Sequence, residues 1–276
     1  MSNNPYLLTD EEVVNFIIYG YHFVEIDFPS GFNETIYKEL EQLGIARTND
    51  LASAILERVP KLQQVYDHPK VSGALTSLLG KDFMMYEDSY CHKNIPGTRS
   101  QYWHQDGPNQ RHHQIRDVFS LYYPQDVTPD MGPTALVPGT HFRNAPTERV
   151  VTYGTFKGQV LTTVKAGTVV IVHFDIWHAA TANTSNKTRY MVKCPFGRVS
   201  EPKGPSWNHD PQKAQVALQH LTETNSIESS QSDTYKEATL RWDMLNHLIG
   251  NSLTKESYLQ RKIRNAKSDR ALRKSS

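Results

Sequence analysis

Residues 131–140 read Met-Gly-Pro-Thr-Ala-Leu-Val-Pro-Gly-Thr, in which a short β-rich run lies between two turn signals, Gly132-Pro133 and Pro138-Gly139. Similar runs recur from residue 82 to residue 200. Many short strands separated by turns are typical of an antiparallel sandwich or barrel, whereas a doubly wound fold would alternate strands with helices. The sequence therefore predicts a mainly β core with strands at Phe83–Tyr90, Val118–Tyr123, Thr134–Val137, Gln159–Val164, Thr168–Phe174 and Arg189–Pro195.

Helical patterns flank this β-rich core on both sides. Thr9 and Glu12 form a capping box ahead of a helix that ends at Gly20, and a strand over Tyr21–Asp27 follows. We interpret the chain as a single domain over 1–276, with helical support from 1–81, the core over 82–200 and a helical C-terminal extension over 201–276. Further helices are predicted over Asn33–Leu43, Asp50–Glu57, Pro69–Leu79, Thr234–Ile249 and Lys255–Arg264.

Composition argues against several classes of protein. The 276 residues carry 30 Lys+Arg and 29 Asp+Glu, a formal charge of +1, so no global basic field exists to bind nucleic acid. No apolar run approaches the roughly 18 residues of a membrane span, and the N-terminus lacks the pattern of a secretory signal. Two isolated cysteines, Cys91 and Cys194, suit a reducing compartment. We expect a cytoplasmic protein that binds neither nucleic acid nor membrane; its oligomeric state stays open.

The strongest local signal for chemistry is Trp103-His104-Gln105-Asp106, whose last three residues we call the HQD motif. On a strand, residues i and i+2 point to the same face, so His104 and Asp106 can bind one metal ion. His178 is the best candidate for the third ligand. Two imidazoles and one carboxylate leave about three positions open on a non-haem Fe(II), enough for a chelating co-substrate and dioxygen.

A His-x-Asp pattern alone is weak evidence, because the chain has a second one, His173-Phe174-Asp175 (the HFD motif), which we interpret as structural. Arg189 strengthens the hypothesis, since a guanidinium pairs bidentately with a carboxylate and so suggests a dicarboxylate co-substrate. The turn-rich segment 183–187 is expected to bring Arg189 back alongside the strand of His178. Three other histidines are expected at the surface or facing substrate: His112, His113 and His141.

Three stretches in this order resemble the phytanoyl-CoA dioxygenase-like family of Fe(II)/2-oxoglutarate oxygenases. They are Trp103–Asp106, then Asp126–Thr128 leading into Gly132–His141, and finally Gly167–Arg189 with Trp177-His178 inside it. Together they span about residues 93–193, over a third of the chain. The resemblance implies a double-stranded β-helix, or jelly-roll, core with flanking helices.

The same resemblance implies roles for six residues. His104, Asp106 and His178 match the metal ligands, and Arg189 matches the residue that holds the distal carboxylate of 2-oxoglutarate. Lys93 and Tyr122 match residues that lie near the co-substrate in some members. Where several relatives carry a serine that bonds the co-substrate, this chain has Ala180.

The implied activity is hydroxylation of a small-molecule substrate, with Fe(II), 2-oxoglutarate and O2, and with ascorbate as a candidate reductant. Related halogenases have a small residue at the position of Asp106, so the carboxylate here favours hydroxylation over chlorination. Desaturation, epimerisation and cyclisation stay open. So do a non-catalytic jelly-roll binding protein and a cupin-type zinc or manganese hydrolase or isomerase, although cupin sites usually use more histidines than this motif offers.

Overall fold

The computed structural model describes residues 5–45, 54–107, 112–144, 149–150, 154–212, 214, 217, 221 and 233–250. The following statements concern these residues. Its helices are α1 (Asp10–Tyr19), α2 (Phe32–Gln42), α3 (Ile55–Arg58), α4 (Lys61–Tyr66), α5 (Pro69–Leu79), the 3-10 turn η1 (Thr140–Phe142) and α7 (Asp233–Leu248). Its strands are β1 (Tyr21–Val24), β2 (Met84–Met85), β3 (Tyr90–Asn94), β4 (Trp103–His104), β5 (Asp117–Tyr122), β6 (Thr134–Val137), β7 (Arg149–Val150), β8 (Val160–Leu161), β9 (Val169–His173), β10 (Trp177–Ala180) and β11 (Arg189–Gly197).

The N-terminal helices follow the signals in the sequence. The capping box of α1 is present, because the Thr9 hydroxyl accepts from the backbone N–H of Glu12 while the Glu12 carboxylate accepts from that of Thr9. Helix α5 has the predicted bounds, with a proline in its first turn. Helix α4 was not predicted, and the predicted helices over Asp50–Glu57 and Lys255–Arg264 lie partly and wholly outside the described residues, respectively.

The strands form two antiparallel sheets that face each other as a jelly roll. The larger sheet has the order β1-β9-β5-β11-β2, with β3 also paired to β11, and the smaller one has the order β7-β4-β10-β6-β8. Every strand pair within the described residues is antiparallel. The predicted mainly β core is therefore confirmed.

Strand bounds differ from the prediction where the chain turns. The run Phe83–Tyr90 is not one strand: β2 ends at Met85, and β3 begins only at Tyr90. Glu87 and Asp88, residues with low strand propensity, lie in the break. The strand predicted over Tyr21–Asp27 ends at Val24, and that over Gln159–Val164 is reduced to β8.

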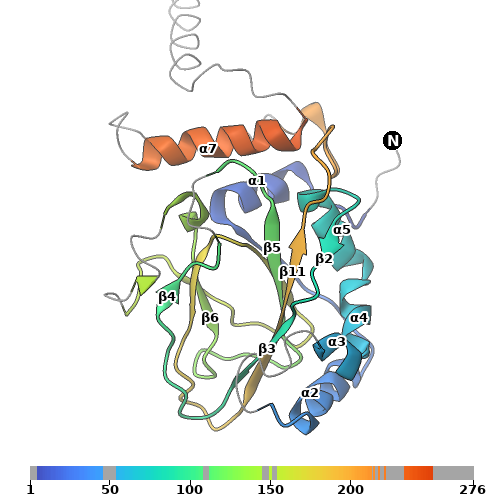
Figure 1. The fold of residues 1–276 in the computed structure, drawn as a ribbon, viewed down its shortest axis with the longest axis vertical. Coiled ribbons are helices and arrows are strands. Elements are labelled where there is room, and N and C mark those ends of the chain that lie inside the picture. The colour runs from blue at the N-terminus through green and yellow to red at the C-terminus, as the bar shows by residue number, and fades with distance from the viewer. Residues whose placement is uncertain are drawn as a thin grey trace, which may run out of the picture.

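The two faces of the larger sheet have separate cores. Helices α1 to α5 cover its outer face, and α7 lies across the end of the molecule next to α1 (Figure 1). The outer face packs apolar side chains such as Val192 and Ile171 against these helices. The inner face contributes Leu121, Val172 and Met191 to a second cluster between the sheets, where any cavity of the jelly roll must lie.

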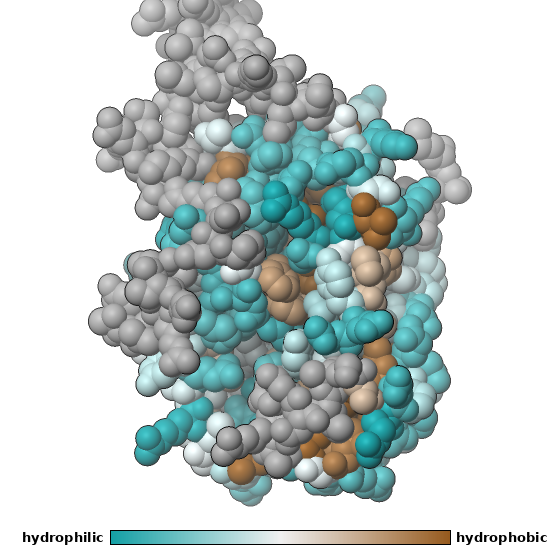
Figure 2. Space-filling view, viewed as in Figure 1, coloured by the Kyte–Doolittle hydropathy of each residue, from teal (hydrophilic) through white to brown (hydrophobic). Residues whose placement is uncertain are grey.

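Among the coloured residues on the face seen in Figure 2, hydrophilic side chains predominate, and the apolar patches are small and scattered. None of the helices in the described part of the chain combines the length and the apolarity that a membrane span requires.

Candidate metal centre

Three side chains, two on strands of the smaller sheet and one just beyond a strand end, meet at one point. His104 and His178 are direct partners across the β4–β10 pair, so their imidazoles share a face, with ring centroids 4.3 Å apart. Asp106 lies two residues beyond His104, just past the end of β4. One potential ligand atom from each of the three residues lies within 4.8 Å of the others. The structure thus brings together the three predicted metal ligands.

Backbone contacts aim both imidazoles at this point. The Nδ1 atom of His104 lies 2.9 Å from the carbonyl oxygen of Tyr102, and the Nδ1 atom of His178 lies 3.0 Å from that of Ile176. A carbonyl only accepts, so each Nδ1 carries the proton, and each Nε2 keeps its lone pair free for a metal.

The spacing of these atoms fits a metal ion. The Nε2 atom of His178 lies 3.3 Å from Oδ2 of Asp106, and the Nε2 atom of His104 lies 3.7 Å from Oδ1. Ligands about 2.1 Å from a metal and at right angles to each other would be ~3.0 Å apart, so small side-chain rotations suffice. The side chains of His104 and Asp106 are 28% and 25% exposed, which leaves the centre open on one side.

The charges of the site favour the forms that bind metal. Burial alone would raise the pKa of Asp106, but the charges of His178 and Lys193 outweigh it and hold this pKa at about 2. Burial, together with the Lys193 ammonium, lowers the pKa of His178 to about 3. The site therefore presents a carboxylate and a neutral imidazole at neutral pH, as metal binding requires.

Arg189 lies in the same cavity as His104 and His178, but it comes from the opposite sheet. The expectation that it lies alongside the His178 strand is wrong: β11 pairs with β2, β3 and β5, whereas β10 pairs with β4 and β6. The segment after β10 crosses between the sheets, so the guanidinium reaches the cavity from the facing wall.

The guanidinium of Arg189 is 1% exposed and only partly bonded. Its Nη2 donates to the carbonyl oxygen of Gly132 at 2.8 Å, while Nε and Nη1 are buried and have no hydrogen-bond partner among the described residues. A buried cation with unpaired donors is costly unless a ligand pairs with it. These donors fit a carboxylate in the cavity, as 2-oxoglutarate would provide.

Lys93 and Tyr122 do not lie at the site, which corrects the expectation for both. Lys93 is opposite Tyr190 on β11, and its Nζ lies 6.0 Å from that ring, on the outer face of the sheet. Tyr122 also faces the helices, and its hydroxyl donates to Asn33 Oδ1 at 2.7 Å. Their neighbours in sequence, His92 and Leu121, line the cavity instead.

The structure adds two polar residues that the motifs did not indicate. Lys193 lies two strand repeats beyond Arg189 on the inner face of β11, and its Nζ donates to Asp106 Oδ2 at 2.5 Å. Thr134 is the direct partner of Ala180 across β6 and β10, and both line the cavity. A hydroxyl therefore lies directly opposite the position where several relatives carry a serine. The every-second-residue spacing on Arg189–Pro195 could have indicated Lys193.

The HFD motif has a different environment from the HQD motif. Asp175 is buried in the turn between β9 and β10, where its carboxylate accepts from Gln105 Nε2 at 3.1 Å and contacts His112 Nε2 at 2.9 Å. A Cβ added to Gly107 would lie 1.6 Å from Asp175 Oδ1, so the carboxylate also packs against the backbone after the HQD motif. Asp175 therefore connects the turn before His178 to the loop after β4, which carries the ligand position Asp106.

Of the described histidines outside the cluster, His141 and His173 are buried, and most of the others are partly exposed. His141 is 2% exposed and bonded to the carbonyl oxygen of Ile17, so the expectation that it lies at the surface or faces substrate is wrong. Its ring packs 4.7 Å from that of His173, and burial lowers the pKa of His141 to about 3. His112 contacts Asp175, and the ring of His113 lies 5.7 Å from that of His247 on α7.

A jelly roll with two imidazoles and one carboxylate at the open end of its cavity, and an arginine on the facing sheet, defines a class of mononuclear metal oxygenase. The family model for phytanoyl-CoA dioxygenase matches residues 38–191, more than half of the chain. The chain belongs to this family, and thus to the Fe(II)/2-oxoglutarate oxygenase superfamily of enzymes.

Solved structures share the fold at low identity. HygX from Streptomyces hygroscopicus, with nickel and 2-oxoglutarate bound, is 17% identical with a TM-score of 0.59, over 73% of this chain and 90% of its own. EctD from S. alaskensis in its apo form is 18% identical with a TM-score of 0.60, over 76% and 84%. SnoK, a carbocyclase from nogalamycin biosynthesis, is 20% identical with a TM-score of 0.55, over 78% and 94%. A comparison with curated proteins finds no matching sequence.

Proposed function

We propose that the protein is an Fe(II)/2-oxoglutarate-dependent dioxygenase that hydroxylates an unactivated C–H bond of a small-molecule substrate. When bound, iron, 2-oxoglutarate and O2 supply the oxidation, in which one oxygen atom enters the substrate and the other enters succinate as carbon dioxide leaves. The observation that carries the proposal is the joint placement of the His104–Asp106–His178 cluster and the half-bonded Arg189 guanidinium around one cavity.

His104, Asp106 and His178 would hold the iron through two neutral imidazoles and one carboxylate. The backbone carbonyls of Tyr102 and Ile176 fix the ring orientation before metal arrives, which lowers the entropy lost on binding. Because Asp106 occupies a ligand position, no position is freed there for a halide.

Arg189 would hold the distal carboxylate of 2-oxoglutarate through guanidinium N–H groups that its bond to Gly132 leaves available, while the Gly132 carbonyl keeps the guanidinium in place. The Thr134 hydroxyl accepts from Tyr123 at 3.3 Å, and its own hydrogen can be donated to the same ligand. Apolar neighbours such as Leu136 and Met191 exclude water from this end of the cavity, which strengthens charged contacts inside it.

The test measures succinate from 2-oxoglutarate with the purified protein, Fe(II) and ascorbate. We expect succinate above a metal-free control even without substrate, and none with His178→Ala. Absence of succinate from wild-type protein shown to contain iron would contradict the proposal and favour a non-catalytic binding protein. Product analysis with a substrate found by screening separates hydroxylation from desaturation, epimerisation and cyclisation.

Arg189→Met gives a second, independent test. Loss of a bidentate charged contact costs about 2–5 kcal/mol, so the concentration of 2-oxoglutarate needed for half-maximal succinate formation should rise tens- to thousands-fold. Lys93→Met, on the outer face of the same sheet, is the matched control and should leave it unchanged. An unchanged requirement in Arg189→Met would place the carboxylate contact elsewhere.

A further inference from the structure

Two cationic side chains of strand β11, Arg189 and Lys193, line the cavity at different ends. Arg189 and Lys193 are four residues apart on the inner face, so at ~3.3 Å per residue their Cα atoms are separated by about 13 Å. Arg189 is bonded to Gly132, and Lys193 contacts the metal-ligand position Asp106. Only Arg189 has a role in the proposed binding of 2-oxoglutarate.

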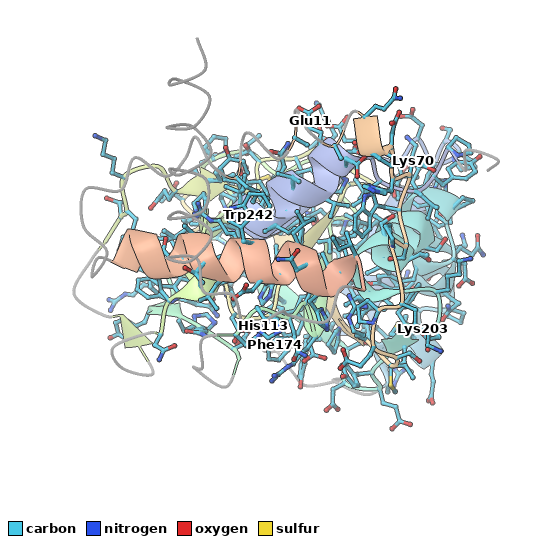
Figure 3. All side chains as sticks on the ribbon, turned by 90° about the horizontal axis from the view of Figure 1, so that it is seen from above. Glu11, Lys70, His113, Phe174, Lys203 and Trp242 are labelled. Atoms are coloured by element: carbon cyan, nitrogen blue, oxygen red, sulfur yellow. The ribbon has the colours of Figure 1, made fainter. Side chains whose placement is uncertain are left out.

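The Lys193 end of the cavity is the end toward α7. Strand β11 runs toward α7 in Figure 1, so Lys193 lies nearer to this helix than Arg189 does. The Lys193 ammonium lies 3.8 Å over the ring of Phe119, which stacks on Phe174 at 4.5 Å. Figure 3 looks down onto α7, and Phe174 is labelled in this view. Of the two rings, that of Phe119 lines the cavity, so this end combines a cation with an aromatic wall, beside the exposed side of the metal ligands.

The contacts of Lys193 with the described residues use only part of its hydrogen-bonding capacity. Its side chain is 10% exposed, and its ammonium has three N–H donors and no acceptor. One donor is bonded to Asp106, and the Phe119 ring covers one side. A metal ion would bind the same carboxylate. The negative charge of Asp106 would then neutralise the Lys193 ammonium less than it does without the metal.

The charges around the cavity leave an excess of positive charge. Arg189 and Lys193 are cations and Asp106 is an anion, while imidazoles that bind a metal are neutral and burial lowers the pKa of His92. A divalent iron and a doubly charged 2-oxoglutarate cancel each other. One positive charge therefore remains in a largely buried space, at the end where Lys193 lies.

We propose that Lys193 is a specificity-determining residue that binds a carboxylate of the primary substrate beside the metal. The inference rests on the proposed function, which supplies the charges of iron and 2-oxoglutarate. A monocarboxylate would neutralise the single remaining positive charge. A neutral substrate would leave the buried ammonium without a counter-charge, and a doubly charged phosphate ester would leave one negative charge in excess. The Phe119 ring, which lines the cavity, favours an apolar body attached to this carboxylate.

The test compares a carboxylate with a neutral molecule of the same shape. Binding of octanoate and of octanamide is measured by calorimetry on protein loaded with Zn(II) and 2-oxoglutarate, in which no turnover takes place. Hydrogen bonds to charged groups contribute about 1.5–3 kcal/mol, so octanoate should bind about ten- to a hundredfold more tightly than octanamide. Lys193→Met should abolish this preference, and Lys93→Met should keep it.

Three results would overturn the inference. They are equal binding of the two probes to wild-type protein, an undiminished preference in Lys193→Met, and a loss of 2-oxoglutarate affinity in Lys193→Met as large as its loss of octanoate affinity. The last would assign Lys193 to the metal-side carboxylate of 2-oxoglutarate. Lys193→Gln, which keeps a donor toward Asp106, serves if the methionine variant fails to fold. Since the assay needs no oxidation, its outcome is separate from that of the succinate assay.

Discussion

The chain contains two His-x-Asp motifs, and the structure gives them opposite environments. The HQD motif has side chains 28% and 25% exposed at the edge of a cavity, with the Nε2 atom of His104 facing Asp106. In the HFD motif the side chains of His173 and Asp175 are 1% and 3% exposed, and His112 and Gln105 bond the carboxylate. The same pattern can therefore form a metal site or a structural connection, and the neighbours decide which.

The two motifs differ in how many hydrogen bonds the protein already makes to the carboxylate oxygens of each aspartate. Around the HQD motif, lone pairs point at a common centre, and Lys193 is the donor within the described part of the chain that bonds the Asp106 carboxylate. Around the HFD motif, the oxygens of Asp175 are bonded to Gln105 and His112. A carboxylate whose oxygens are already bonded has little left to offer a metal.

Removing one member of the HQD motif should have the largest effect. Structural zinc sites with four ligands are worth about 10–16 kcal/mol, so His104→Ala should weaken Zn(II) binding by roughly 3 kcal/mol, about a hundredfold or more. Because His104 is partly exposed, the free energy of unfolding of the metal-free protein should change little. Calorimetry and urea unfolding measure the two quantities. If His173→Ala weakened metal binding as much, the two motifs would not differ in role.

Asp175→Asn should weaken metal binding, but less than the loss of a ligand does. The amide can still accept from Gln105 but loses the charge that His112 contacts, so the HQD loop should be held less firmly. Residues that orient metal ligands typically contribute 10–100-fold to metal affinity, and we expect the lower part of that range. Metal affinity is measured as above, with Asp126→Asn, an exposed carboxylate paired with Lys165, as the control. Equal affinities in both variants would limit Asp175 to a packing role.

The buried histidine of the HFD motif should make stability depend on pH. Burial lowers the pKa of His173 far below 6.5, so below pH 6.5 the unfolded chain binds a proton that the folded protein does not. Stability should therefore fall as pH is lowered, by up to about 1.4 kcal/mol per pH unit from this group. Urea unfolding at pH 7.5 and 5.5 measures the slope, which should be shallower in His173→Phe. An equal slope would assign the dependence to other groups, such as His141.

Tyr122→Phe should have the smallest effect. It removes one hydrogen bond to Asn33, which costs about 1 kcal/mol, and should leave 2-oxoglutarate binding unchanged because Tyr122 faces the helices. Urea unfolding and a 2-oxoglutarate titration check both statements. A weakened 2-oxoglutarate affinity would show that the outer face of the sheet influences the cavity.

Local signals explain which parts of the fold the sequence predicts. The capping box of α1, the proline start of α5 and the turns around β6 all act within a few residues, so they can be identified without tertiary information. The crossing of the chain from β10 to the opposite sheet depends on distant partners, which periodicity does not indicate.

The candidate site shows the same limit on a finer scale. His104, Asp106 and His178 were predicted from a motif and lie together. The resemblance predicts Lys93 at the site, but the residue that lines the cavity is its neighbour His92. Adjacent residues on a strand point to opposite faces of the sheet, so an error of one position places the side chain on the wrong face. Thr134 was missed because its relation to Ala180 exists only across a strand pair.

Gly132 restricts how the arginine end of the cavity can be redesigned. The oxygen that orients Arg189 belongs to the main chain of this glycine, so no substitution at position 132 can delete it. A side chain there would meet Asn94 Nδ2 at 2.3 Å and would have to adopt a φ of +70°, which would displace the turn and the oxygen with it. A library that seeks a different ketoacid co-substrate should therefore vary Thr134 and Ala180 while holding Gly132 constant.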